Sequence, residues 1–217
     1  MIDWGVFVRY GPVLIDGLKA TLYFCSAALV IGLPLGVGLA VLRLVRHPLP
    51  RLLVQAYVEV IRSTPFLVQA FVVYYVLPEF GVRLTAGGAG VLALSAYAAA
   101  YVAEIVRGGI EAVPAGQVEA ARSLGMPAAL TLRRIVIPQI WGVAIPALTN
   151  HYITLIKESS LLSVITVAEL TFAGQLILGR TFRPVEPYLA ITVLYWLINA
   201  MLAEVSARLE RRLTAYR

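Results

Sequence analysis

The sequence predicts an all-α integral membrane protein with about five membrane-spanning helices. Its 217 residues are 60% hydrophobic and 14% charged, with a mean hydropathy of +0.83, which lies outside the range of soluble domains. Several uncharged stretches reach the roughly 20 residues that a spanning helix needs. A polar segment, residues 117–134, separates the third stretch from the fourth. We expect one transmembrane domain, residues 1–217, without a separate soluble enzyme.

The amino-terminal part of the chain divides into an interfacial segment and a first span. Residues 1–16 mix aromatic and charged side chains, which is typical of an interfacial helix. They lack the pattern of a cleaved signal peptide. Residues 20–42 carry no charge and form the first predicted span. Within it, Gly32 and Gly36 are spaced so that another helix can approach closely.

A second span is expected over residues 53–77. Glu59 and Arg62 lie three positions apart in it, close enough to pair on a helix. We favour an ion pair that holds helix packing over a gate contact, because charges inside membranes usually pair. Pro65 should kink this helix.

The third predicted span, residues 84–103, carries a polar stripe towards its end. Tyr97, Tyr101 and Glu104 fall on one helix face. Glu104 and Arg107 could simply pair at the membrane edge. The tyrosines and the carboxylate could equally form a wall for a polar solute, since ionisable residues inside membranes are often functional. The sequence leaves both interpretations open.

The polar segment that follows predicts a short helix over residues 117–124. Glu119 is expected near its start, where a carboxylate interacts favourably with the helix dipole. Ala120 and Ala121 give it a face small enough to enter a groove of a partner. Gly125 permits a sharp left-handed exit.

The fourth span begins at residues 135–156 and meets four polar residues, 157–160, within a longer apolar stretch. Such residues are tolerated at membrane depth only where they face protein or water. We therefore predict a broken fourth helix, with Ser159 or Ser160 as the N-cap of the half-helix that follows. A loop over residues 174–187 and a last span over 187–203 complete the chain.

Basic residues predict the orientation. Eleven of the 18 lysines and arginines fall on one side: Arg43, Arg46, Arg51, Arg107, Arg122, Arg133, Arg134, Arg208, Arg211, Arg212 and Arg217. Five fall on the other: Arg9, Lys19, Arg83, Arg180 and Arg183. The richer side should be cytoplasmic, which puts the N-terminus outside and the C-terminus and residues 117–124 in the cytoplasm.

Several functions are disfavoured. The sequence contains no phosphate-binding Gly-x-x-x-x-Gly-Lys-Ser/Thr loop, no cluster with metal-ligand spacing and no Gly-x-Ser-x-Gly elbow. The net charge of +6 is scattered between apolar runs, which argues against a nucleic-acid groove. His151 stands alone and is expected to be a packed residue. Cys25, the single cysteine, can form no internal disulfide.

One pattern identifies a family. It resembles the coupling-loop signature of ABC importer membrane subunits, which consists of Glu-Ala-Ala, three residues, Gly, nine residues, Ile, one residue and aliphatic-Pro. It reads here Glu119-Ala120-Ala121, Gly125, Ile135 and Ile137-Pro138, with isoleucine at 137 where the family usually has leucine. Four further segments resemble the polar amino acid branch of this family, which includes histidine, arginine, glutamate, glutamine and cystine permeases. These segments are residues 17–22, 59–65, 100–110 and 157–161.

The resemblance implies a type I ABC importer-like permease subunit for an amino acid, multi-pass in the bacterial inner membrane. Its coupling loop would span about residues 111–138, with Glu119, Ala120, Ala121, Gly125 and Pro138 as coupling residues. It implies a dimer of ATP-binding cassette subunits that binds ATP and Mg²⁺, an extracytoplasmic amino acid binding protein, and a second permease subunit, identical or similar. The chain itself would hold no cofactor. An intramembrane enzyme using Glu104 or Glu158 would leave the polar segment unexplained, and a channel would conduct without ATP.

An amino acid zwitterion needs a fixed partner for each of its charges in a low-dielectric site. Glu158 or Glu104 could hold the ammonium, and the start of the half-helix could hold the carboxylate. Alternatively, Lys157 and Glu158 only neutralise each other. The scarcity of further acids favours neutral or acidic substrates. The full candidate set lies on two faces expected to oppose each other: Tyr97, Tyr101 and Glu104, against Asn150, Thr154, Glu158, Ser159 and Ser160.

Overall fold

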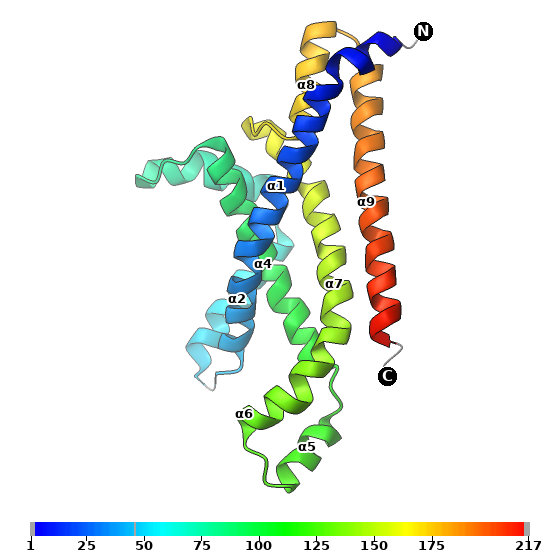
Figure 1. Cartoon of the computed structure of the whole chain (residues 1–217). Helices are drawn as coiled ribbons and strands as arrows, with labels where there is room; N and C mark the ends of the chain where they lie inside the picture. The colour runs from blue at the N-terminus through cyan, green and yellow to red at the C-terminus, as the bar shows by residue number, and fades with distance from the viewer. Residues whose placement is uncertain (1–2, 46, 215–217) are drawn as a thin grey trace.

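The computed structural model describes residues 3–45 and 47–214, and within these ranges it contains helices and no strand (Figure 1). Four helical segments are long and apolar enough to cross a membrane: Trp4–Arg43, Ala86–Glu111, Ala128–Ile165 and Val185–Arg211. A bent pair of helices could supply a fifth span. The predicted all-α membrane fold is confirmed. Arg46 and Arg217, counted in the orientation, lie outside the described residues.

The first helix, α1 (Trp4–Arg43), is continuous over 40 residues. The prediction of a separate interfacial helix over residues 1–16 is therefore wrong. Asp3 caps the start of α1, where its carboxylate accepts from the Gly5 N–H at 3.0 Å. Gly17 lies inside α1, buried against α8 (Leu170–Thr181), where an added Cβ would come within 2.9 Å of the Ala173 Cβ.

The centre of the bundle is the pair formed by α1 and α4 (Ala86–Glu111), its most extensive helix contact. A Cβ at Gly32 would lie 2.6 Å from the Ala98 Cβ, and one at Gly36 would lie 2.5 Å from the Val102 Cβ. Only glycine permits this separation, so the predicted close approach at these two positions is confirmed. Helices α7 (Ile137–Glu158) and α9 (Val185–Thr214) lie alongside (Figure 1).

The second predicted span is sharply bent. It consists of α2 (Pro48–Ser63), α3 (Phe66–Phe71), a π-helix η1 (Val72–Val76) and a 3₁₀-helix η2 (Leu77–Phe80), with an angle of 110° at the break. Pro65 forces extended backbone on Thr64. The Gln69 side chain then donates to the Ile61 and Thr64 carbonyls at 2.7 and 3.1 Å. Gln69 thus supplies hydrogen-bond donors for carbonyls at the break between the two helices. The observed bend is far larger than the predicted kink.

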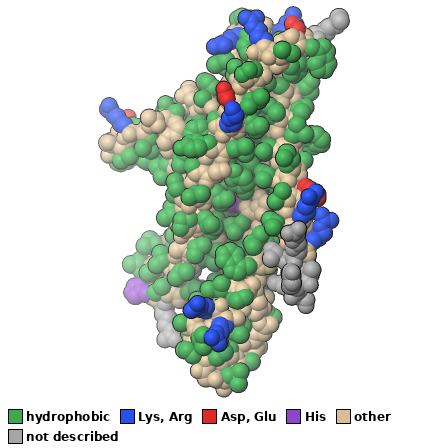
Figure 2. Space-filling view, viewed as in Figure 1, with side chains coloured by type: hydrophobic (Ala, Val, Ile, Leu, Met, Phe, Trp, Pro, Cys, Tyr) green, Lys and Arg blue, Asp and Glu red, His purple; other side chains and the backbone are tan. Residues whose placement is uncertain are grey.

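The region after α7 is more helical than predicted. The 3₁₀-helix η4 (Ser159–Ile165) leads to α8 (Leu170–Thr181). Glu169 caps α8 by accepting from the Phe172 N–H at 2.8 Å. The predicted loop over residues 174–187 is therefore wrong, because α8 covers most of it. In Figure 2, hydrophobic side chains cover most of the visible surface, and the basic side chains form small, separate groups on it.

Candidate functional site

The polar segment forms a lobe at one end of the bundle (Figure 1), made of α5 (Ala115–Ser123), α6 (Ala128–Thr131) and the π-helix η3 (Leu132–Val136). Gly125 has φ +74°, so the predicted left-handed exit from the short helix is confirmed. Its N–H donates to the Arg122 carbonyl at 2.9 Å. The helix starts at Ala115, earlier than predicted, because Pro114 precedes it.

The two alanines of α5 face different surroundings. Ala121 is 4% exposed and packs within its own chain, so the prediction that it belongs to a partner-facing surface is wrong. Ala120 is exposed, and it shares a helix face with the exposed Gly116 and with Leu124, which is 82% exposed. We call these three residues the α5 outer face. Glu119 lies in the middle of α5 rather than near its start.

A continuous helix joins the later part of the lobe to the bundle, running from Ala128 through α6, η3, α7 and η4 to Ile165, whereas residues 124–127 separate α5 from this helix. Pro138 is separated from η3 by Ile137 alone, so its missing N–H falls where the π-helix passes into α7. The Gln139 side chain donates to the Gln117 amide oxygen and so ties α5 to α7.

A charged cluster lies where α1, α2 and α4 meet. The Glu104 carboxylate accepts from Arg43, contacts Arg62 at 3.2 Å and binds Arg107 at 2.9 Å. The pairing of Glu104 with Arg107 is confirmed. The predicted pair of Glu59 with Arg62 is wrong, because in the described residues Arg62 pairs with Glu104 instead. The part-buried Glu104 carboxylate thus pairs both with Arg107 of its own helix and with Arg43 and Arg62, which no sequence spacing connects to it.

The tyrosine stripe faces the interior of the bundle. The Tyr97 and Tyr101 rings lie 4.6 Å apart, and the His151 ring of α7 stacks on Tyr101 at 4.9 Å and 12°. His151 is buried, which confirms the expectation of a packed histidine. It was not among the expected site residues, although it is the α7 side chain that meets the tyrosines. The sequence signal that could have indicated His151 as a site residue was its position next to Asn150, which was in the expected set.

The expected α7 face is only partly assembled. Asn150 is exposed, whereas its neighbour His151 stacks on the tyrosines. The Thr154 hydroxyl donates to the Asn150 carbonyl at 3.1 Å. Glu158 is half-buried. Lys157 is exposed, and no ion pair within the described residues joins it to Glu158. The ring contact between α7 and the tyrosines is the one that His151 makes.

The two serines do not cap a half-helix. The Ser159 hydroxyl donates to the Ile156 carbonyl at 2.8 Å, and the Ser160 hydroxyl donates to the Lys157 carbonyl at 2.6 Å. The predicted N-cap role is wrong, because both side chains bond back to the preceding turn. The fourth helix is interrupted here by a change from α to 3₁₀ geometry. Tighter 3₁₀ turns often mark such a functional interruption.

A cavity of about 360 Å³ opens between α2 and α4 beside the charged cluster. Its wall carries both signs of charge, from Arg43 and Arg62 and from Glu59 and Glu104. Tyr101 joins the wall, so the cavity reaches the tyrosine stripe. Within the described residues, no group of three or more His, Cys, Asp or Glu side chains could hold a metal ion.

Residues 32–215 match the family described as the inner membrane component of binding-protein-dependent transport systems. The chain belongs to this family of transport permeases. The L-cystine transport system permease TcyB of Bacillus subtilis (strain 168) is 37% identical over 99% of this permease and 93% of its own length. The probable amino-acid ABC transporter permease PatM of Vibrio harveyi is 36% identical over 97% and 96% of the two chains.

Solved structures agree with this assignment. A chain from the crystal structure of an amino acid ABC transporter with histidines superposes with a TM-score of 0.94, at 40% identity, covering 98% of this permease and 99% of that chain. The MetNI methionine ABC transporter in an inward-facing conformation shares the fold, with a TM-score of 0.76 at 24% identity over 93% and 96%. The predicted recognition, importer-type fold and function as an ABC transporter permease are confirmed.

Proposed function

We propose that this permease carries an amino acid across the inner membrane into the cytoplasm, and that a separate subunit supplies the energy by hydrolysing ATP. One observation carries the proposal: the exposed α5 outer face is joined by a short connection, residues 124–127, to a continuous helical run that begins at Ala128 and includes α7, whose far end carries Thr154 and Glu158. Docking and substrate contact then lie on one mechanical element, which suits rigid-body coupling.

The partners follow from this architecture. A dimer of ATP-binding cassette subunits, which binds the ATP and Mg²⁺, receives the α5 outer face. An extracytoplasmic amino acid binding protein delivers the substrate at the opposite end. A second permease subunit, identical or closely similar, completes the pathway. The names of the relatives, for cystine and other amino acids, support this set of partners and the substrate class.

We place the substrate along the wall formed by Tyr97, Tyr101 and Glu158, and Glu104 supports this wall by binding three arginines. The adjoining cavity of about 360 Å³ has room for an amino acid and offers both signs of charge to a zwitterion. Glu158 is the better ammonium partner, because no ion pair within the described residues occupies it, whereas three arginines occupy Glu104. Ser159 and Ser160 are less suited to bind the substrate carboxylate, because their hydroxyl hydrogens are donated to the preceding turn, whereas the exposed Asn150 side chain remains available to the substrate.

The test of the function is reconstitution in liposomes with the ATP-binding subunit and the binding protein encoded beside it. We expect uptake of one or a few amino acids, neutral or acidic in preference to basic, and hydrolysis of ATP that the loaded binding protein stimulates. Uptake that continues without ATP would instead identify a channel. Hydrolysis without stimulation by any amino acid would refute the proposed substrate class.

The substrate site predicts unequal effects for two variants of α7. Glu158→Gln should weaken the apparent affinity for the amino acid about tenfold or more, because hydrogen bonds to charged groups are worth about 1.5–3 kcal/mol. Thr154→Val should change it less than about threefold, since the Thr154 hydroxyl already bonds to the Asn150 carbonyl. Uptake at varied substrate concentration measures both. Unchanged affinity in Glu158→Gln would move the site elsewhere.

The orientation predicts a labelling pattern. Single cysteines replace Arg83, near the η2–α4 connection, and Ala129, on α6, in a Cys25→Ala background, and the permease is expressed alone. Both positions are exposed. A membrane-impermeant thiol reagent should label Arg83→Cys in intact cells, and Ala129→Cys only after permeabilisation. The reverse pattern would invert the proposed topology.

A further inference from the structure

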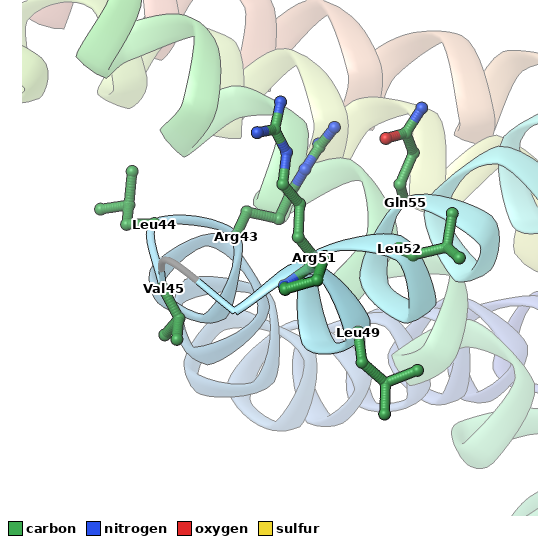
Figure 3. A pocket seen from close by; sticks show the side chains of 8 residues that line it. Arg43, Leu44, Val45, Leu49, Arg51, Leu52 and Gln55 are labelled. Carbon is green, nitrogen blue, oxygen red and sulfur yellow. The ribbon is translucent and has the colours of Figure 1, made fainter.

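A second cavity, of about 750 Å³, lies where α1 passes into α2. Among the described residues, its lining contains two arginines and no acidic residue: Arg43, Leu44, Val45, Pro48, Leu49, Arg51, Leu52 and Gln55. Figure 3 shows the Arg43 and Arg51 side chains extending to the same side of the turn as Gln55, while Leu49 extends the other way. Arg43 and Gln55 also line the smaller cavity proposed for the substrate, whereas the other lining residues belong neither to that cavity nor to the α5 lobe.

The charges of the cavity favour an anion. Arg51 is exposed and forms no ion pair with another described residue. Arg43 donates to Glu104, which holds the Arg43 guanidinium in place at the wall. The nearby acids, Glu59 and Glu104, line the adjoining smaller cavity, where Arg62 also lies. The amino-terminal end of α2 at Pro48 adds the positive end of a helix dipole.

The rim of the cavity is apolar and exposed. Leu49 is 56% exposed and Leu52 is 64% exposed, and Leu44 and Val45 are exposed beside them. Arginines next to exposed leucines form an amphipathic surface of the kind that binds at the headgroup level of a bilayer. A soluble anion would satisfy the arginines but would leave the leucines in water.

We propose that this cavity binds the headgroup of an anionic glycerophospholipid, of the phosphatidylglycerol class. Its phosphate contacts Arg51 and Arg43, the Gln55 amide meets the glycerol hydroxyls, and the acyl chains lie along Leu49 and Leu52. The proposed topology places this cavity at the cytoplasmic leaflet of the membrane, and the inference rests on that topology. A second copy of the chain is the less suitable occupant, because a two-fold contact here would bring the arginines of both copies together.

The test uses the full-length permease purified in detergent. Native mass spectrometry measures binding of dimyristoyl phosphatidylglycerol and dimyristoyl phosphatidylcholine, which share their acyl chains. We expect phosphatidylglycerol to bind about fivefold tighter or more, since each basic residue near an anionic surface contributes about that factor. Arg51→Gln should abolish most of this preference. Arg83→Gln, which removes one exposed charge elsewhere, should keep it. Leu52→Gln should weaken both lipids equally.

Three outcomes would overturn the inference: equal binding of the two lipids by the native permease, an undiminished preference in Arg51→Gln, or displacement of the lipid by millimolar inorganic phosphate, which would identify a free-anion site. Arg51 is exposed, so its variant should fold, and an unchanged thermal midpoint checks this. The lipid preference is measured without ATP or amino acid. Its failure beside intact ATP-driven uptake would therefore refute this inference alone.

Discussion

Replacing Glu104 by glutamine is expected to destabilise the permease by about 2–3 kcal/mol, because the change leaves three arginines facing each other without a carboxylate. Removal of one partner from a buried ion pair costs about 3–5 kcal/mol. The lower figure applies here because the side chains of Arg62 and Arg107 are 44% and 39% exposed, and solvent screens part of their repulsion. The loss should appear in α1, α2 and α4 together, since Glu104 joins all three.

The matched control for this variant is Glu111→Gln. Glu111 is exposed and pairs with Arg107 alone among the described residues, so its loss should cost less than about 0.5 kcal/mol. Unfolding in mixed micelles with a denaturing detergent compares the two free energies. Equal values for both variants would show that the cluster does not hold the helices together.

The same pair of variants separates the two interpretations of Glu104. If Glu104 mainly holds helices, stability falls and the affinity for the amino acid in the remaining folded protein stays unchanged. If Glu104 holds the substrate ammonium, affinity falls while stability is kept. Because three arginines already surround Glu104, we expect the first result.

The α5 outer face predicts the second large effect. Ala120→Leu should reduce substrate-stimulated ATP hydrolysis about tenfold or more, because a groove that fits an alanine cannot accept the added methylenes without strain. The stability of the permease itself should not change, since Ala120 is exposed. ATP hydrolysis by the assembled complex and thermal unfolding of the isolated permease measure the two quantities.

Two further substitutions make the comparison sharper. Ala121→Leu should destabilise the permease itself by about 1–3 kcal/mol, because Ala121 is packed within its own chain. Ala115→Leu, at the first residue of α5 and off the outer face, should leave both hydrolysis and stability near their normal values. A surface helix that lies on lipid would tolerate the added leucine at Ala120. Normal hydrolysis in Ala120→Leu would therefore refute docking through this face.

The sequence by itself determined the class of protein, the long apolar helices, the glycine contacts of α1 and the turn at Gly125. These depend on the composition of each segment and on local backbone preferences, which a single sequence displays. It also determined the family, because the coupling pattern spans residues whose spacing is specific. The cap at Glu169, and with it α8, also depends on local residues. The sequence analysis missed this helix because it expected a loop over residues 174–187.

Only the tertiary structure decided which residues face each other. Arg62 pairs with Glu104 of another helix rather than with Glu59 of its own, because the fold brings a part-buried carboxylate within reach. His151, and not Asn150, meets the tyrosines, since one residue rotates the direction of a helical side chain by about 100°. Ala121 is buried and Ala120 is exposed for the same reason. Periodicity predicts that a helix has a polar face, but the packing of distant segments decides what that face contacts.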